Sequence, residues 1–462
     1  MASALRSSSS RRPVRSTRPR TERWPSATEP TSTPCTGTSS SRSSSASSLL
    51  ASERRPEPRA AAFAVVPTEE RKIRCRTSFS RWGTRRPGVC GPASPRRRPG
   101  ERAEGRRAST RKGLERTAAR GCERFARKAG RRVIDVNVEE RGPLDRAQGC
   151  WLGQIVGDAL GTTVEFQAPE GIARRFPQGL RELVGGGPFG LLPGQVTDDT
   201  ELALALARSL VAEGRYEREA VAAAYRAWYR SGPFDVGGTT RRAFGGPETD
   251  ADGMERRANR ESQANGSLMR ASPLGIFGWR LPPEALAVLA AQDSRLSHPH
   301  PVCVASCVVF THAIARALRT GEGPEALYAA TLDYACREAL CEPVLDTLRA
   351  AAKDPPADYV RSMGWVRIAL QNAFYRLLHA PSFEEGLVAT VAAGGDTDTN
   401  GCIAGALLGA VHGLDAVPSR WKETALGCVT DRGPTYQTHD ALALAEALLL
   451  RGAQIEAGGT TP

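Results

Sequence analysis

Residues 394–412 read GGDTDTNGCIAGALLGAVH, an acidic and hydroxyl-rich cluster followed at once by small and apolar residues at helical spacing. The same arrangement occurs earlier, where Thr197-Asp198-Asp199-Thr200 stands directly before ELALALARSLVAEG. The spacing predicts a helix after each cluster, and Gly214 is a typical C-terminal stop. Capping would explain one Thr or Asp at each helix start, since these side chains accept the unpaired N–H groups. Two matching clusters exceed that need.

The two clusters favour a metal site if the helix starts face each other. Their four carboxylates would then converge, and like charges so close must either protonate or bind cations. Hard divalent ions such as Mg²⁺ or Mn²⁺ prefer carboxylate and hydroxyl oxygens. Two such ions would hold a water and polarise a sugar hydroxyl together. Helix capping and a metal site both remain open at this stage.

Helical spacing continues on both sides of these clusters. It predicts helices over 144–160, 202–210, 221–228, 302–319, 324–340, 360–378, 401–412 and 438–451, without convincing strand alternation or a fixed repeat. We therefore expect one large, all-α domain of orthogonally packed helices at 142–455, followed by a disordered tail at 456–462. Two loops, 185–194 (GGGPFGLLPG) and 237–246 (GGTTRRAFGG), are too glycine-rich to be spacers only.

The N-terminal third has a different character. Residues 1–150 carry 35 Lys and Arg against 14 Asp and Glu, whereas the remainder carries 28 against 36. Residues 1–132 are rich in Ser, Arg and Pro and poor in large apolar residues, so we expect 1–141 to be a disordered arm. Three interpretations stay open: an organellar transit peptide, a basic tail for nucleic acid or anionic surfaces, and a start site placed too early.

The composition also argues against several classes of protein. The basic excess is confined to the arm, so we expect no specific nucleic-acid binding by the core. No uninterrupted apolar run reaches 18 residues and no secretory signal is present, so we expect no membrane span and a cytoplasmic monomer. Cys303 and Cys307 share a helical face, but small buried thiols account for them better than a metal site does.

Three shorter motifs lie between the acidic clusters or before them. Gly157-Asp158-Ala159-Leu160-Gly161, with Glu165 after it, permits close backbone approach, although ordinary helix packing would explain it too. The turn at 264–270, ANGSLMR, has N–H groups that would cradle a phosphate, or it is only a turn. His298 and His300 precede a helix, where contact with a ligand hydroxyl or phosphate is favoured over zinc.

Taken in order, these segments resemble the ADP-ribosylglycohydrolase family. The resemblance covers about 144–450 and rests on GDALG with Glu165, VTDDT at 196–200, ANGSLMR at 264–270, SHPHP at 297–301 and GGDTDTN at 394–400. It implies an all-α fold with two Mg²⁺ or Mn²⁺ ions in a central cleft. The implied metal ligands are Thr197, Asp198, Asp199, Asp396, Asp398 and Thr399. The implied substrate contacts are Asn265, Gly266, Ser267, Met269 and His298, with Gly394 and Gly395 beside the diphosphate.

The reaction that the resemblance implies is hydrolysis at the anomeric carbon of ADP-ribose. Glu165 would cover the substrate, and Asp396 or Asp398 would act as the base. The expected substrate is ADP-ribosyl-arginine on a protein or a small conjugate, with serine-linked and O-acyl conjugates as alternatives. An alternative function is that of an ADP-ribose-binding protein without catalytic activity. A different class also fits Asp396-Thr397-Asp398-Thr399, the aspartyl-phosphate phosphatases, but that chemistry needs the motif after a strand, and 387–393 is only weakly strand-like.

Overall fold

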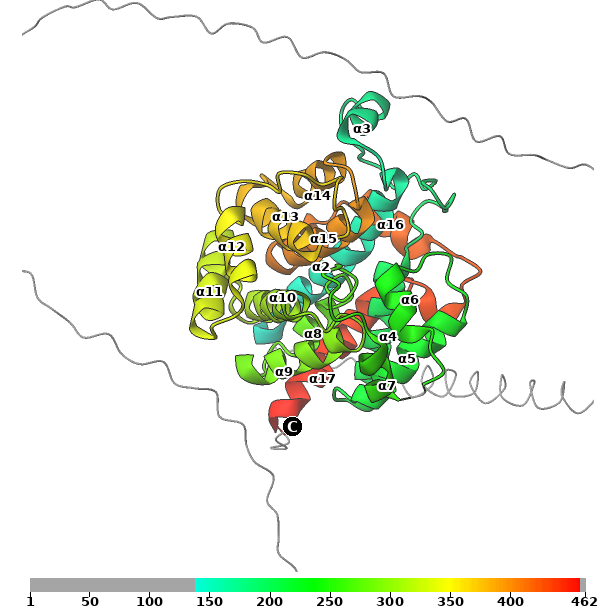
Figure 1. Ribbon diagram of the computed structural model, residues 1–462. Helices are drawn as coiled ribbons and strands as arrows, with labels where there is room; N and C mark the ends of the chain where they lie inside the picture. The colour runs from blue at the N-terminus through cyan, green and yellow to red at the C-terminus, as the bar shows by residue number, and fades with distance from the viewer. Residues whose placement is uncertain (1–137, 249, 458–462) are drawn as a thin grey trace, which may run out of the picture. The chain divides into compact units, whose positions relative to one another are not determined.

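The computed structural model describes residues 138–248 and 250–457, and within these ranges the chain is helical, without a named strand (Figure 1). Two isolated bridges, Gly186 with Leu191 and Ala264 with Trp365, are the only β-type pairings described there. The α-helices are α2 (Val138–Gly161), α3 (Pro169–Arg175), α4 (Asp198–Glu213), α5 (Arg218–Arg230), α6 (Gly238–Phe244), α7 (Ala251–Arg257), α8 (Ser272–Phe277), α9 (Pro283–Arg295), α10 (Pro301–Thr320), α11 (Pro324–Arg337), α12 (Glu342–Ala351), α13 (Val366–His379), α14 (Phe383–Ala392), α15 (Thr397–His412), α16 (Ser419–Gly427) and α17 (Ala441–Ala457). Short 3₁₀ helices are η1 (Thr162–Val164), η2 (Leu414–Ala416) and η3 (Pro434–Tyr436).

The all-α prediction is confirmed, and most predicted helices are found with shifted ends. Gly214 ends α4 in the left-handed conformation, as its position after the apolar run indicated. The segment predicted as one helix over 324–340 ends at Arg337, and α12 follows it. The first described helix begins at Val138, four residues before the expected boundary at 142. The rest of the predicted arm lies outside the described residues, as does 458–462 of the predicted tail.

The centre of the fold is an antiparallel pair of helices, α2 and α15, which lie side by side in Figure 1. Glycines spaced four apart line the contact on both helices. A Cβ atom on Gly153 would lie 2.1 Å from the carbonyl oxygen of Gly405, and one on Gly409 would lie 2.0 Å from that of Gly149. Only glycine allows this approach, because any side chain would collide with the opposite backbone. The contact sets the end of α2 against the start of α15.

Helix α10 is a long, apolar helix that packs against both helices of this pair. By length and composition it is apolar enough to cross a membrane. The sequence analysis overlooked it because it looked only for an uninterrupted apolar run of 18 residues. Most of its apolar window (83%) is buried inside the protein, as in the core helix of a globular domain. Cys303 and Cys307 lie on α10 as buried free thiols, in keeping with the interpretation as core residues.

The segment before the second acidic cluster decides against the phosphatase alternative. Residues 383–392 form α14, and Ser382 caps it by accepting a hydrogen bond from the backbone N–H of Glu385 (3.2 Å). The motif at 396–399 therefore follows a helix and begins another. The aspartyl-phosphate chemistry requires a strand at this place, so the structure removes that reading.

Candidate active site

The last turn of α2 brings the two acidic helix starts together. The hydroxyl of Thr397 donates to the carbonyl of Gly161 (2.6 Å), which ties the start of α15 to the end of α2. Asp158, one turn earlier, accepts hydrogen bonds from the backbone N–H groups of Thr197 (3.1 Å) and Thr200 (3.1 Å). Asp158 thus caps α4 from another helix, a role that Thr197 does not perform with its own side chain. One turn of α2 positions both clusters.

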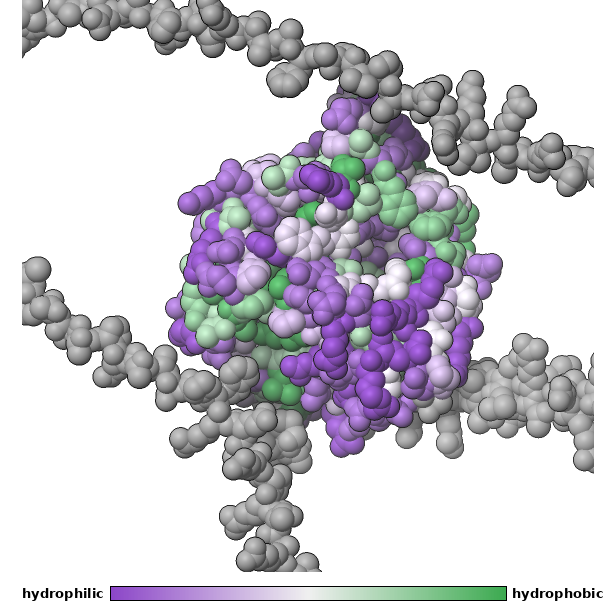
Figure 2. Space-filling view, in the orientation of Figure 1, coloured by the Kyte–Doolittle hydropathy of each residue, from purple (hydrophilic) through white to green (hydrophobic). Residues whose placement is uncertain are grey.

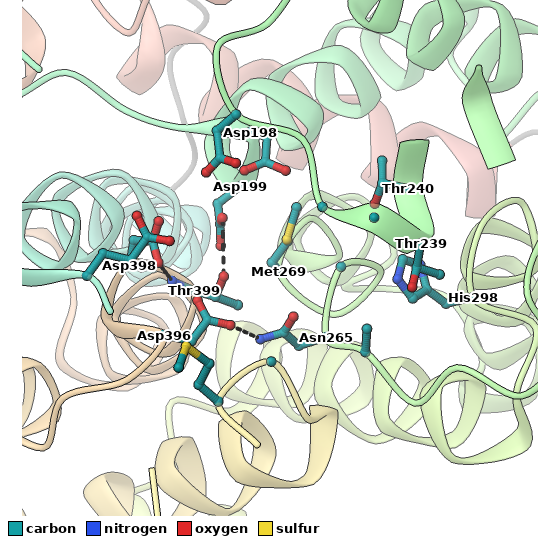
Figure 3. A pocket seen from close by; sticks show the side chains of 18 of the residues that line it. Asp198, Asp199, Thr239, Thr240, Asn265, Met269, His298, Asp396, Asp398 and Thr399 are labelled. Carbon is teal, nitrogen blue, oxygen red and sulfur yellow. Dashed lines mark hydrogen bonds between the residues drawn. The ribbon is translucent and has the colours of Figure 1, made fainter. Parts of the chain in front are cut away.

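The two clusters meet across a cavity of about 270 Å³ (Figure 3). The hydroxyl of Thr399 in α15 donates to the Oδ2 atom of Asp199 in α4 (3.3 Å), a direct contact between the clusters. Six carboxylates line the cavity: Glu165, Asp198, Asp199, Asp235, Asp396 and Asp398. All but the half-buried Asp235 are buried. The convergence expected from the sequence is therefore present.

Negative charge in this cavity has no basic partner among the residues that line it. Burial, reinforced by the neighbouring carboxylates, raises the pKa of Asp198, Asp199 and Asp398 well above the usual range of an aspartate. Burial and the nearby Asp396 raise the pKa of Glu165 to about 9. Carboxylates held this close, without arginine or lysine, are stable as anions only when a cation joins them.

The donor atoms are of the kind that a hard cation binds. Carboxylate oxygens of Glu165, Asp235 and Asp398 lie within 4.8 Å of one another. Two further oxygens, Oδ1 of Asp199 and Oε2 of Glu165, are buried and accept no hydrogen bond from the described residues. An all-oxygen set that leaves buried lone pairs unused suits Mg²⁺ or Mn²⁺ better than softer metals.

The wall opposite Asp398 in Figure 3 comes from the 264–270 turn and the start of α6. The side-chain amide of Asn265 donates to Oδ2 of Asp396 (2.7 Å), which joins this wall to the acidic side. Behind the wall, the guanidinium of Arg270 donates to the carbonyl of Gly266 (3.1 Å) and to Asp293 (3.1 Å). Arg270 is fully buried, so the turn is fixed from inside the domain.

His298 lines the cavity as a neutral side chain. Burial and, second, the charge of Arg270 lower the pKa of His298 to about 3. The Ser297 hydroxyl accepts a hydrogen bond from Arg270 (2.8 Å) and lies 2.8 Å from Nδ1 of His298. With Arg270 as a donor to that oxygen, the Ser297 proton is available for Nδ1, and we adopt the tautomer in which Nδ1 accepts it. The ring proton of His298 is then on Nε2, which makes Nε2 a donor.

Ten of the fourteen predicted site residues line the cavity: Glu165, Asp198, Asp199, Asn265, Gly266, Met269, His298, Asp396, Asp398 and Thr399. The other four do not. The hydroxyl of Thr197 donates to Asp158 (3.0 Å), and that of Ser267 accepts from Ser294 (3.0 Å), so both are turned to neighbours in the protein.

Gly394 and Gly395, beside which the resemblance places a diphosphate, do not line the cavity. Both have positive φ (75° and 76°). A Cβ atom on Gly395 would lie 1.9 Å from the carbonyl oxygen of Tyr359, and Gly395 exchanges backbone hydrogen bonds with Phe166 (2.8 Å) and Gln167 (3.0 Å). The glycines let protein backbone approach, and they hold the segment after Glu165 against the second acidic cluster.

Nine lining residues were not among the predicted site residues: Phe166, Asp235, Gly237, Gly238, Thr239, Thr240, Ala264, Met363 and Gly364. Asp235 stands alone in a loop, without a repeat or a matching cluster. One signal was available in the glycine-rich segment 237–246. The sequence predicted a loop there, but most of it forms α6, and the first turn of this helix presents Thr239 and Thr240 to the cavity (Figure 3).

The fold and the site define a helical protein with a carboxylate-lined cavity at two helix starts, the architecture that the sequence resemblance implied. The sequence model of the ADP-ribosylglycohydrolases matches residues 139–456, so the chain belongs to the ADP-ribosylglycohydrolase family. A solved structure described as an ADP-ribosylglycohydrolase-related protein complex has a TM-score of 0.57 and 32% identity, covering 68% of this chain and 99% of that chain.

Two relatives have names that state an activity. The chain is 34% identical over 303 residues to an ADP-ribosyl-(dinitrogen reductase) glycohydrolase of Rhodospirillum rubrum, covering 65% of this chain and 97% of that protein. It is 31% identical over 315 residues to the ADP-ribosylarginine hydrolase Tri1 of Pseudomonas putida (strain GB-1), covering 65% of this chain and 81% of that protein.

Proposed function

We propose that this protein hydrolyses the bond between the anomeric carbon of ADP-ribose and a conjugated side chain, with two Mg²⁺ or Mn²⁺ ions bound in the cavity. The observation that carries the proposal is a cavity lined by six carboxylates, four of them at two helix starts, without arginine or lysine in the lining. Membership of the family and the activities that name its relatives support the same reaction.

The ions would be held by Asp198 and Asp199 from α4 and by Asp396, Asp398 and Thr399 from α15. The predicted ligand Thr197 is set back from the cavity, but its hydroxyl is also 3.3 Å from Oδ2 of Asp199, at the edge of this group. Bound divalent ions supply charge neutralisation, an orienting contact for sugar hydroxyls, and a more acidic water.

The remaining residues bind and orient the substrate. The side-chain N–H₂ group of Asn265 donates to Asp396, which fixes the orientation of the amide. The amide oxygen of Asn265 would then accept a hydrogen bond from the substrate. His298 would donate from Nε2 to a phosphate or hydroxyl oxygen, which a neutral imidazole does without adding a second charge. Glu165, whose pKa is raised to about 9, would carry a proton at neutral pH in the absence of cations and cover the ligand from the end of η1.

Arginine is the proposed leaving group. A guanidinium is a planar cation that stays charged at every physiological pH, and carboxylates bind it through paired hydrogen bonds. Asp235 and Glu165, whose carboxylate oxygens lie within 4.8 Å of each other and of one from Asp398, would offer such oxygens. The name of the Pseudomonas putida relative specifies ADP-ribosylarginine, which supports the same choice.

The test is the release of free ADP-ribose from ADP-ribosyl-arginine by the full-length chain, followed by chromatography with Mg²⁺ and with excess chelator. We expect release that depends on the metal. Equal release in both conditions would contradict the metal site. A protein that releases nothing but gains thermal stability with ADP-ribose would be tested next on serine-linked and O-acyl conjugates, and failure there would identify an ADP-ribose-binding protein without turnover.

A further inference from the structure

The glycine-rich loop at 185–194 has no place in the chemistry proposed above, yet its conformation is closely specified. Five of its residues are glycines with positive φ, at 185, 186, 187, 190 and 194. Gly186 and Leu191 exchange two backbone hydrogen bonds of 2.8 Å. A Cβ atom on Gly187 would lie 2.0 Å from the carbonyl oxygen of Thr162. The loop is therefore pinned on η1, directly before Glu165, in a conformation that L side chains rarely adopt.

This pinned loop presents hydrophobic side chains to solvent. Its Phe189 packs on Phe234, with ring centroids 5.5 Å apart. Among the described residues seven large hydrophobic side chains are exposed, and four of them belong to this loop or to segments that it contacts: Phe166 (54%), Val184 (48%), Leu192 (49%) and Phe234 (37%). We call Phe166, Val184, Phe189, Leu192 and Phe234 the mouth patch. Figure 2 shows hydrophobic residues on this side of the domain, between α3 and α16.

The mouth patch reaches the cavity through Phe166 and Phe234. Phe166 lines the cavity itself, and Phe234 precedes Asp235, which also lines it. Scattered exposed hydrophobic residues are common on protein surfaces, but several of them on a closely specified loop and on the segments beside a binding cavity are typical of an interaction site. A side chain that enters the cavity while attached to a protein must bring its flanking residues across this rim.

We propose that the mouth patch docks the polypeptide on either side of the modified residue, and that it fits a segment with apolar residues next to an ADP-ribosylated arginine. This inference rests on the proposed function and goes further, because it assigns a protein-recognition surface outside the cavity. Phe189 and Phe234 provide a fixed aromatic pair for an apolar side chain, while the carboxylates take the cationic group. Small conjugates, which lack flanking residues, do not use the patch.

The test compares two peptides of equal length that carry ADP-ribose on a single arginine. One has Leu and Phe next to the arginine and the other has Ser at the same positions; free ADP-ribosyl-arginine is the third substrate. We expect the full-length chain to prefer the apolar peptide about tenfold in kcat/KM, the effect of burying one apolar side chain. Leu192→Asp should remove this preference and leave the free conjugate unaffected, since Leu192 does not line the cavity. Val184→Asp is a second variant with the same expectation.

Val288→Asp is the matched control, because Val288 on α9 is as exposed (50%) as Leu192 but lies outside the patch. It should leave all three substrates unchanged. Equal rates for both peptides, or an undiminished preference in Leu192→Asp and Val184→Asp, would overturn the inference. If the free conjugate is not hydrolysed, the proposed function fails separately. The dissociation constants of the two peptides then decide the docking inference by the same comparison.

Discussion

Asp293 and the carboxylates of the cavity are both buried, but they differ in what neutralises them. Asp293 accepts a hydrogen bond from the guanidinium of Arg270 (3.1 Å), and Glu201 likewise accepts from Arg432 (2.7 Å). Residues that line the cavity include no arginine or lysine. Removing two charges from water requires a partner for each. The paired acids are neutralised within the fold, whereas the unpaired acids form the site at which we propose that cations bind.

The largest effect expected from this comparison is on activity. Asp398→Asn removes one carboxylate from the unpaired group, so release of ADP-ribose should fall on the order of a thousandfold. The helical circular dichroism spectrum should be unchanged. In chelator the melting temperature should rise, because one like charge is gone. An active variant would show that the reaction does not need Asp398. It would also contradict the distinction between acids paired with arginine, which belong to the fold, and unpaired acids, which belong to the site.

The second effect is on stability, and it concerns the paired acids. Arg270→Met leaves Asp293 buried without its partner and should cost about 3–5 kcal/mol of unfolding free energy. The double variant Arg270→Met/Asp293→Leu should recover part of that loss, as urea unfolding would measure. Arg337→Met is the control, since its pair with Asp333 is exposed and should not affect the unfolding midpoint. If the double variant is no more stable than Arg270→Met, the cost does not come from the unpaired charge.

A third prediction concerns the pH dependence of the metal-free protein. Burial and Asp396 raise the pKa of Glu165 from 4.5 to about 9, so between these values the folded chain binds a proton that the unfolded chain has released. Stability must therefore fall as the pH rises through this window. We expect the melting temperature in chelator to decrease from about pH 5 to pH 9, and Mg²⁺ to flatten the curve. A curve that is the same with and without Mg²⁺ would contradict the cation site.

These regions also differ in how far the sequence could predict them. The acidic helix starts were recognisable because composition and helical spacing are both visible within a few residues. The two helix starts converge because the glycines of α2 pack against those of α15. The four-residue spacing of these glycines is visible in the sequence, but it does not prove that the two helices pair in this register. The place of Asp235 in the cavity lining could not be predicted, because a single acidic residue in a loop is part of no periodic pattern. The packing of Gly395 against the carbonyl of Tyr359 could not be predicted, because it is set by tertiary packing alone.

The smallest expected effect comes from Asp158, which lies between the two kinds of buried acid. It has no arginine partner, and burial raises its pKa to about 6, but Thr197 and Thr200 donate hydrogen bonds to it. Asp158→Asn replaces one acceptor oxygen by an N–H₂ group that faces these donors. We expect a loss of about 1–2 kcal/mol in urea unfolding, as for a helix cap, and a modest fall in activity. A loss of activity as large as that of Asp398→Asn, with stability intact, would instead place Asp158 among the acids that hold the cations.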